Sequence, residues 1–92
     1  MIKIVTWNMC YWKLCSIFSD SWKFLSENIN PDVGMVQETI PPKTPGSLKN
    51  FVWEKIGGKR NWGTGIFSKY NVDKIEFGNA YSGFVTAGEV SK

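Results

Sequence analysis

Two apolar runs on either side of a helical pattern constrain the fold of this chain most strongly. The first run, 2–7, is rich in β-branched side chains, and the second, 33–37, is apolar up to its last residue; both patterns are typical of buried strands. Between them lies a stripe of apolar side chains formed by Phe18, Trp22, Leu25 and Ile29. Its spacing is typical of one face of an amphipathic helix. Strand, helix and strand in this order predict a βαβ unit with parallel strands and a right-handed crossover.

Polar residues follow both predicted strands. Asn8 comes directly after the first run, and Glu38 comes directly after the second. Because parallel strands end at the same edge of a sheet, where open α/β sheets bind ligands, we expect these two side chains to converge. A carboxylate there suits Mg²⁺, and an amide can donate to a phosphate oxygen. The alternative is that both side chains only satisfy groups of the loops that follow them.

The rest of the chain shows a different pattern. Residues 9–16 have no clean period and are expected to form a loop, with Ser16 as a cap of the helix. After a proline-rich loop at 41–47, short strands separated by turns indicate an antiparallel meander. These strands are expected at 51–56, 62–68, 72–77 and 81–85, before a polar tail. The predicted fold class is α+β, a βαβ unit followed by a short antiparallel meander.

Composition limits the size and the kind of protein. A chain of 92 residues makes at most one small domain, and its hydrophobic content of 42% is that of a globular protein. Five tryptophans and six phenylalanines are many for such a domain to cover. They indicate either a compact aromatic core or, as we expect, a surface that belongs against a partner, such as the rest of a larger domain.

Several function classes find no support in the sequence. The chain has no histidine, and Cys10 and Cys15 lack the C-x-x-C spacing, which argues against structural zinc and against nucleophilic catalysis with a histidine base. The net charge of +3 with scattered lysines permits a polyanionic partner without indicating one. Neither a signal peptide nor an apolar run of roughly 20 residues is visible. We therefore expect a cytoplasmic protein with no membrane partner.

Three segments resemble motifs of the endonuclease/exonuclease/phosphatase superfamily. They are 1–8, which ends in Thr-Trp-Asn; 30–38, an Asn-Pro-Asp followed by a strand ending in Gln-Glu; and 63–70, a glycine-containing apolar run ending in Ser-Lys-Tyr. They come in the order of the family and span most of the chain. The resemblance implies a four-layer α-β-β-α sandwich, of which residues 1–92 form a single partial domain, the N-terminal half.

The resemblance also implies an activity and a cofactor. In that family the asparagine equivalent to Asn8 lines the catalytic, phosphate-binding site, and the glutamate equivalent to Glu38 is a catalytic ligand of Mg²⁺ or Mn²⁺. The later family motifs, an Asp-x-Asn pair and an Asp-His pair, have no match in this sequence. We therefore expect the N-terminal part of a Mg²⁺-dependent phosphoesterase that hydrolyses phosphate esters, nucleic acids among them, only when a C-terminal half completes it.

Two alternatives differ in class from this hypothesis. One is a non-catalytic domain that binds nucleic acid or protein through its basic and aromatic surface. The other is complementation, in which a second polypeptide supplies the missing half. A partial domain would leave strand edges unpaired and an apolar face uncovered, so we expect self-association or docking of the C-terminal half there.

Overall fold

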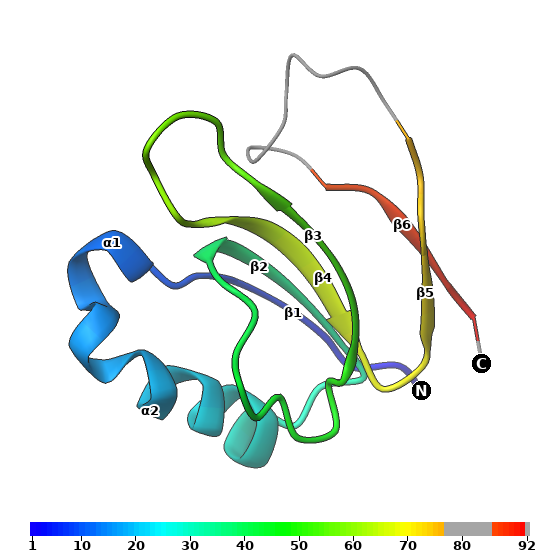
Figure 1. Ribbon diagram of the computed structural model, residues 1–92. Coiled ribbons are helices and arrows are strands. Elements are labelled where there is room, and N and C mark those ends of the chain that lie inside the picture. Colours follow the sequence, from blue (N-terminus) through cyan, green and yellow to red (C-terminus); the bar gives the residue numbers. More distant parts are fainter. Residues whose placement is uncertain (77–85, 92) are drawn as a thin grey trace.

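The computed structural model describes residues 1–76 and 86–91, which form a helical segment and two sheets (Figure 1). The helical segment runs through α1 (Tyr11–Leu14), η1 (Cys15–Ile17), α2 (Phe18–Lys23) and η2 (Phe24–Ile29), the last a π-helix. The strands are β1 (Ile4–Asn8), β2 (Val33–Thr39), β3 (Asn50–Lys55), β4 (Gly63–Ser68), β5 (Asn71–Lys74) and β6 (Gly88–Ser91). None of the helices in these described ranges is long and apolar enough to cross a membrane.

The larger sheet has four strands in the order β1-β2-β4-β3. β1 and β2 are parallel, as a βαβ unit requires, and the helical segment connects them. β4 is antiparallel to both of its neighbours, β2 and β3. β5 and β6 form a separate antiparallel pair. The predicted α+β class, a βαβ unit followed by antiparallel strands, is confirmed.

The helical stripe packs as the sequence predicts. Trp22 and Leu25 are buried, and Phe18 and Ile29 lie half-buried against the same core. The segment ends at Asn30, whose N–H donates to the Leu25 carbonyl at 2.9 Å and whose left-handed backbone (φ 49°) turns the chain out of the helix. Pro31 then prevents the helix from continuing.

The prediction of a loop at 9–16 is wrong, because α1 and the 3₁₀ turn of η1 begin within this range. The residue before α2 is Ile17, so Ser16 is not its cap. Tyr11 packs edge-to-face on Phe18 with ring centroids 4.7 Å apart, which anchors the first turn to the helix. All four residues of α1 remain partly or fully exposed, and this explains why the turn shows no apolar period.

The predicted strands need several corrections at their ends. β1 begins and ends later than the predicted 2–7, and β2 continues to Thr39, beyond the predicted 33–37. β6 lies in the segment expected to be a polar tail, where pairing with β5 outweighs the polar composition. The strand predicted at 81–85 lies outside the described residues.

The core lies between the helical segment and one face of the larger sheet (Figure 1). Within it, the Trp22 ring packs edge-to-face on Phe67 of β4 with centroids 4.7 Å apart. Phe51 of β3 stacks on the same Phe67 ring at 5.1 Å. The buried residues of this core are Met9, Trp22, Leu25, Val36, Leu48 and Phe67. Aromatic contacts therefore join the helix to both strands of the β3–β4 hairpin.

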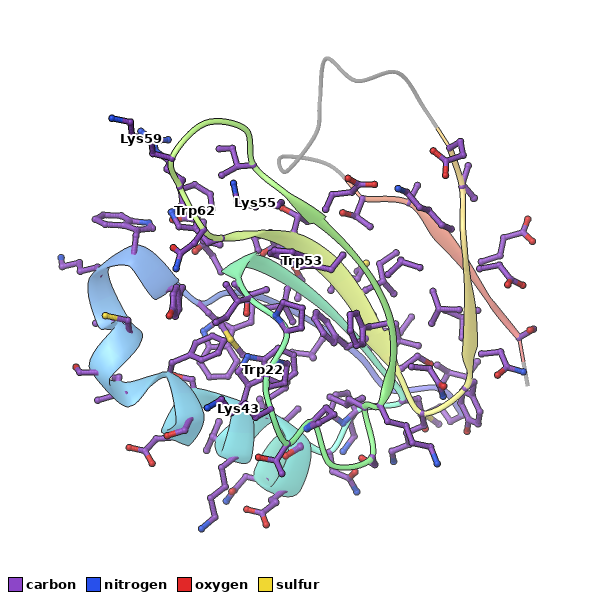
Figure 2. All side chains as sticks on the ribbon, viewed as in Figure 1. Trp22, Lys43, Trp53, Lys55, Lys59 and Trp62 are labelled. Atoms are coloured by element: carbon purple, nitrogen blue, oxygen red, sulfur yellow. The ribbon has the colours of Figure 1, made fainter. Side chains whose placement is uncertain are left out.

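One buried polar residue, Thr39, ties these elements together. Its side chain is fully buried at the end of β2. The Trp22 indole donates to the Thr39 hydroxyl at 3.3 Å, and this hydroxyl donates to the Ile40 carbonyl at 3.0 Å. The Trp53 indole donates to the Thr39 carbonyl at 3.0 Å. Figure 2 shows the two tryptophans approaching from the helix and from β3.

The opposite face of the larger sheet is covered unevenly. The β5–β6 pair lies over β3 and β4, where the Thr86 hydroxyl donates to the Thr64 carbonyl at 2.6 Å. Lys74 of β5 forms a hydrogen-bonded ion pair with Glu54 of β3. The hydrogen bond to Glu54 raises the pKa of Lys74 above its usual 10.5. Over β1 and β2, Ile4 and Met35 remain 60% and 41% exposed, so apolar side chains are open to solvent on this part of the face, beside the polar Thr6 and Gln37.

We expect Thr39→Val to lower the free energy of unfolding by roughly 1–3 kcal/mol, because the buried Trp22 N–H loses its acceptor while the side chain keeps its shape. Urea unfolding measures this as a lower midpoint with an unchanged slope. Thr44→Val, at an exposed position, is the matched control and should change little. Equal stabilities of the two variants would contradict the role assigned to Thr39.

Candidate functional site

The site lies where β1 and β2 end. Asn8 is the last residue of β1 and lies opposite Gln37 in the parallel register. Beyond it, the Met9 N–H donates to the Gln37 carbonyl at 2.9 Å and keeps the chains together. The ends of both strands therefore lie at the same edge of the sheet, where α1 begins.

A β-bulge sets the direction of Glu38. Val36 pairs with Gly65 and Thr39 pairs with Gly63, so β2 has one residue more than β4 over this stretch. In a regular strand Glu38 would point to the same face as Val36, which is fully buried. The extra residue gives the buried position to Thr39 instead. Bulges of this kind re-aim side chains next to functional sites.

The backbone of Glu38 is in the left-handed region, with φ of 50°. This conformation costs a non-glycine residue on the order of 1–3 kcal/mol, and it persists only where the surrounding structure enforces it. The hydrogen bonds on the next residue, Thr39, supply that constraint.

Asn8 and Glu38 are in direct contact. The Asn8 amide nitrogen donates to Oε2 of Glu38, although the two residues are 30 positions apart in the sequence. The side-chain Oδ1 of Asn8 accepts from the Cys10 N–H at 3.0 Å, which orients the amide. Asn8 thus satisfies a loop group, as the alternative interpretation expects, and also contacts the carboxylate.

Trp12 is a member of the site that the sequence does not indicate. Its indole N–H donates to Oε1 of Glu38, so each carboxylate oxygen receives one hydrogen bond. The Trp12 ring nevertheless remains 57% exposed. Only the turn of α1, in a segment expected to be a loop, brings Trp12 back over the strand ends.

A hollow of about 410 Å³ opens beside the carboxylate, lined by Trp12, Glu38, Arg60 and Trp62. The last two come from the loop between β3 and β4, where the Arg60 guanidinium lies 5.7 Å from the centre of the Trp62 ring. Sequence reasoning places Arg60 between the strands expected at 51–56 and 62–68, and it assigns no functional role to Trp62. The signal it lacks is the position of this loop relative to Glu38, which depends on β4 lying between β2 and β3.

The donor set fits a Mg²⁺ or Mn²⁺ ion held by a single protein carboxylate. A carboxylate offers about four lone-pair positions, and the two hydrogen bonds on Glu38 leave room for a metal bond to each oxygen. Mg²⁺ commonly takes one or two protein carboxylates and fills its remaining positions with water and phosphate oxygens. In the described part of the chain, no group of three or more His, Cys, Asp or Glu gathers to form a fuller protein shell.

Asp32 of the Asn-Pro-Asp sequence lies at the opposite end of β2 from Glu38. Its carboxylate accepts from the Lys3 N–H at 2.7 Å and from the Tyr70 hydroxyl at 3.4 Å, and it lies 3.9 Å from the Lys69 ammonium. These bonds tie the starts of β1 and β2 to the end of β4. Asp32 is therefore a structural residue of this fold.

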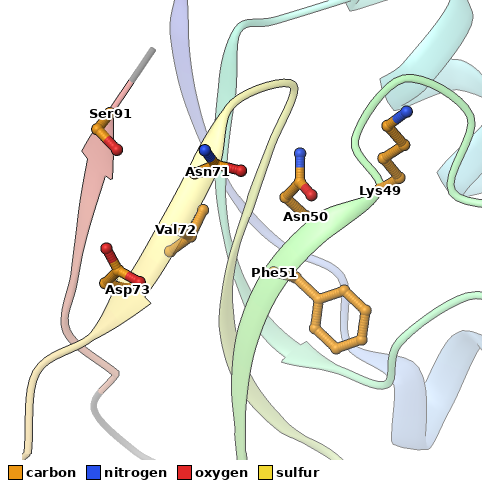
Figure 3. Close-up of a pocket in the computed structure, with 7 residues that line it drawn as sticks. All are labelled: Lys49, Asn50, Phe51, Asn71, Val72, Asp73 and Ser91. Carbon is orange, nitrogen blue, oxygen red and sulfur yellow. The ribbon is translucent and has the colours of Figure 1, made fainter.

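A second hollow, of about 400 Å³, lies between the β3 side of the larger sheet and the β5–β6 pair. Figure 3 shows its lining, with Lys49, Asn50 and Phe51 on one side and residues of β5 and β6 on the other. Asn50 donates to the Lys69 carbonyl at 3.2 Å. Asn50 pairs with the last residue of β4, so this hollow is at the far end of the sheet from Asn8.

Comparisons with protein-family models, with curated proteins and with solved structures give no significant match to this chain. The resemblance to the endonuclease/exonuclease/phosphatase superfamily therefore stays a prediction from the sequence, and so do the roles that it implies for Asn8 and Glu38.

The strain at Glu38 can be measured by comparing two substitutions. We expect Glu38→Gly to be more stable than Glu38→Ala by roughly 1 kcal/mol, because glycine adopts the left-handed conformation at no steric cost. At Met35, in the regular part of β2, we expect the opposite: Met35→Ala should be more stable than Met35→Gly by roughly 0.5–1 kcal/mol. Chemical unfolding of all four variants tests this, and alanine variants more stable than the glycine variants at both positions would mean that Glu38 is unstrained.

Proposed function

We propose that Asn8 and Glu38 form part of a Mg²⁺-dependent site that hydrolyses phosphate esters. The observation that carries this proposal is the contact between the two side chains at the sheet edge. It joins an amide and a carboxylate from distant parts of the chain beside an open hollow. The carboxyl ends of the strands are where α/β sheets commonly bind ligands.

Glu38 would hold the metal ion through its carboxylate oxygens, and Asn8 would orient the phosphate. A bound Mg²⁺ polarises the phosphoryl oxygen and stabilises negative charge as water attacks. The Asn8 amide has a second N–H, which can donate to a phosphate oxygen while the first holds Glu38. The bond from the Cys10 N–H fixes which atoms of this amide face the carboxylate.

The left-handed backbone supports a chemical role for Glu38. Glycine or asparagine would fit this conformation with less strain than glutamate does. Strained positions of this kind are found preferentially at active sites, where the surrounding structure holds them in place. The carboxylate is thus kept in a position that is unfavourable for stability and favourable for binding a cation.

We further propose that hydrolysis requires a second half of the site, from a C-terminal segment or another chain. Glu38 supplies one carboxylate, and the sequence has no histidine to act as a base. The open apolar face of β1 and β2, with Ile4 and Met35, is the surface on which this half would dock. When the chain is by itself, a second copy would occupy the same face.

A cytoplasmic location is part of this proposal. Cys10 and Cys15 are both free thiols, and a reducing compartment keeps thiols in that state.

Binding of Mn²⁺, followed by its electron paramagnetic resonance signal, tests the metal site directly. The chain should bind the ion, and Glu38→Gln should abolish binding, because it removes the charge while keeping the size of the side chain. Glu27→Gln, on the exposed side of the helical segment, is the control and should bind as the unchanged chain does. Undiminished Mn²⁺ binding by Glu38→Gln would refute the metal site.

Sedimentation velocity over a wide concentration range tests the docking face. We expect the chain to self-associate as its concentration rises, and Met35→Lys to keep it monomeric, because a charge would have to be buried in the contact. Lys23→Glu, on the exposed side of α2, serves as the control. A chain that stays monomeric at every concentration would contradict the proposed docking.

A further inference from the structure

We propose that the hollow beside Glu38 binds an unpaired nucleobase, so that the phosphate ester placed at Glu38 belongs to a single-stranded nucleic acid. This inference rests on the proposed function, because it takes Glu38 as the position of the phosphate. It adds the class of substrate, which the strand ends alone leave open.

The lining of the hollow suits a flat aromatic ring. Its walls include the indoles of Trp12 and Trp62 and the guanidinium of Arg60. Bases stack on tryptophan rings and on arginine planes, and such stacking tolerates any base because each has a π face. Trp12 is more than half exposed, so its ring is accessible to a ligand. A phosphosugar or a lipid headgroup offers no flat π face to stack against these groups.

The structure holds the stacking groups in place before any ligand arrives. The Ile56 N–H donates to the Trp62 carbonyl at 2.9 Å and closes the hairpin loop, and Ile56 itself is buried. The Lys55 ammonium donates to the carbonyls of Ile56 and Gly58 at 3.1 and 3.2 Å. On the other wall, the bond to Glu38 orients the Trp12 ring. A preformed surface loses little conformational entropy on binding.

The charge around the hollow suits a polyanion. The loop 55–62 carries Lys55, Lys59 and Arg60 and has no acidic residue. Because Lys55 bonds the loop itself, Lys59 and Arg60 are the cations left for a ligand. Figure 2 shows Lys59 pointing outward from the loop. A phosphate chain that runs from Glu38 past this loop would meet positive charge along its path.

The test compares two probes of equal length and charge, a fluorescently labelled oligothymidylate and an abasic oligonucleotide, with EDTA present. The unchanged chain should bind the oligothymidylate more tightly, and Trp62→Leu should remove that difference. Loss of one stacked base predicts a change of roughly 5- to 150-fold in affinity. Arg60→Ala, at an exposed position, should reduce the same difference without affecting folding. Lys23→Ala, on α2, is the charge-matched control and should preserve it.

Equal affinity of the unchanged chain for both probes would overturn the inference, and so would a base preference that survives in both Trp62→Leu and Arg60→Ala. The far-ultraviolet circular dichroism of each variant shows whether it is folded. The two proposals fail separately. Mn²⁺ binding at Glu38 without a base preference would leave the metal site standing, whereas a base preference in a chain that binds no Mn²⁺ would leave only a nucleic-acid-binding surface.

Discussion

The hydrogen bonds of the buried Thr39 are the constraint on which the rest of this structure depends. A fully buried hydroxyl and carbonyl are tolerated only when both are satisfied, and here Trp22 and Trp53 supply the donors from two different elements. Through them the helical segment, the end of β2 and the β3–β4 hairpin are fixed to one point. Because these bonds hold Thr39 on the buried face, β2 must carry one extra residue between Val36 and Thr39. This extra residue is the bulge.

The bulge turns the end of a buried strand into an exposed carboxylate. Without it the alternation of β2 would direct Glu38 into the helix-covered face beside Val36, where an unpaired charge would be strongly destabilising. The left-handed backbone at Glu38 therefore has a clear physical origin. Its cost is offset by burial of Thr39 and by the two donors, Asn8 and Trp12, that the carboxylate gains.

The sequence predicts those parts of the molecule that depend on local pattern or on topology. The stripe through Trp22 and Leu25 follows from helical periodicity, and the meeting of Asn8 with Glu38 follows from two parallel strands ending at one edge. Trp12, Arg60 and Trp62 could not be predicted in the same way, because an exposed turn of helix and the insertion of β4 beside β2 bring them together. The bulge itself depends on long-range hydrogen bonds to the end of β2. No local pattern records them.

Trp12 connects the two proposals physically. It donates to the Glu38 carboxylate, and its ring lines the hollow beside it. A cation held by Glu38 would share the carboxylate with this indole, and a base stacked on the ring would limit how far the indole can move away. On the two proposals, the metal and the base would both contact Trp12, and thermodynamic linkage makes any effect of one on the affinity of the other reciprocal. The sign of that coupling depends on whether Trp12 keeps its bond to Glu38 when the metal is present, because only a ring that stays in place offers its stacking face to the base.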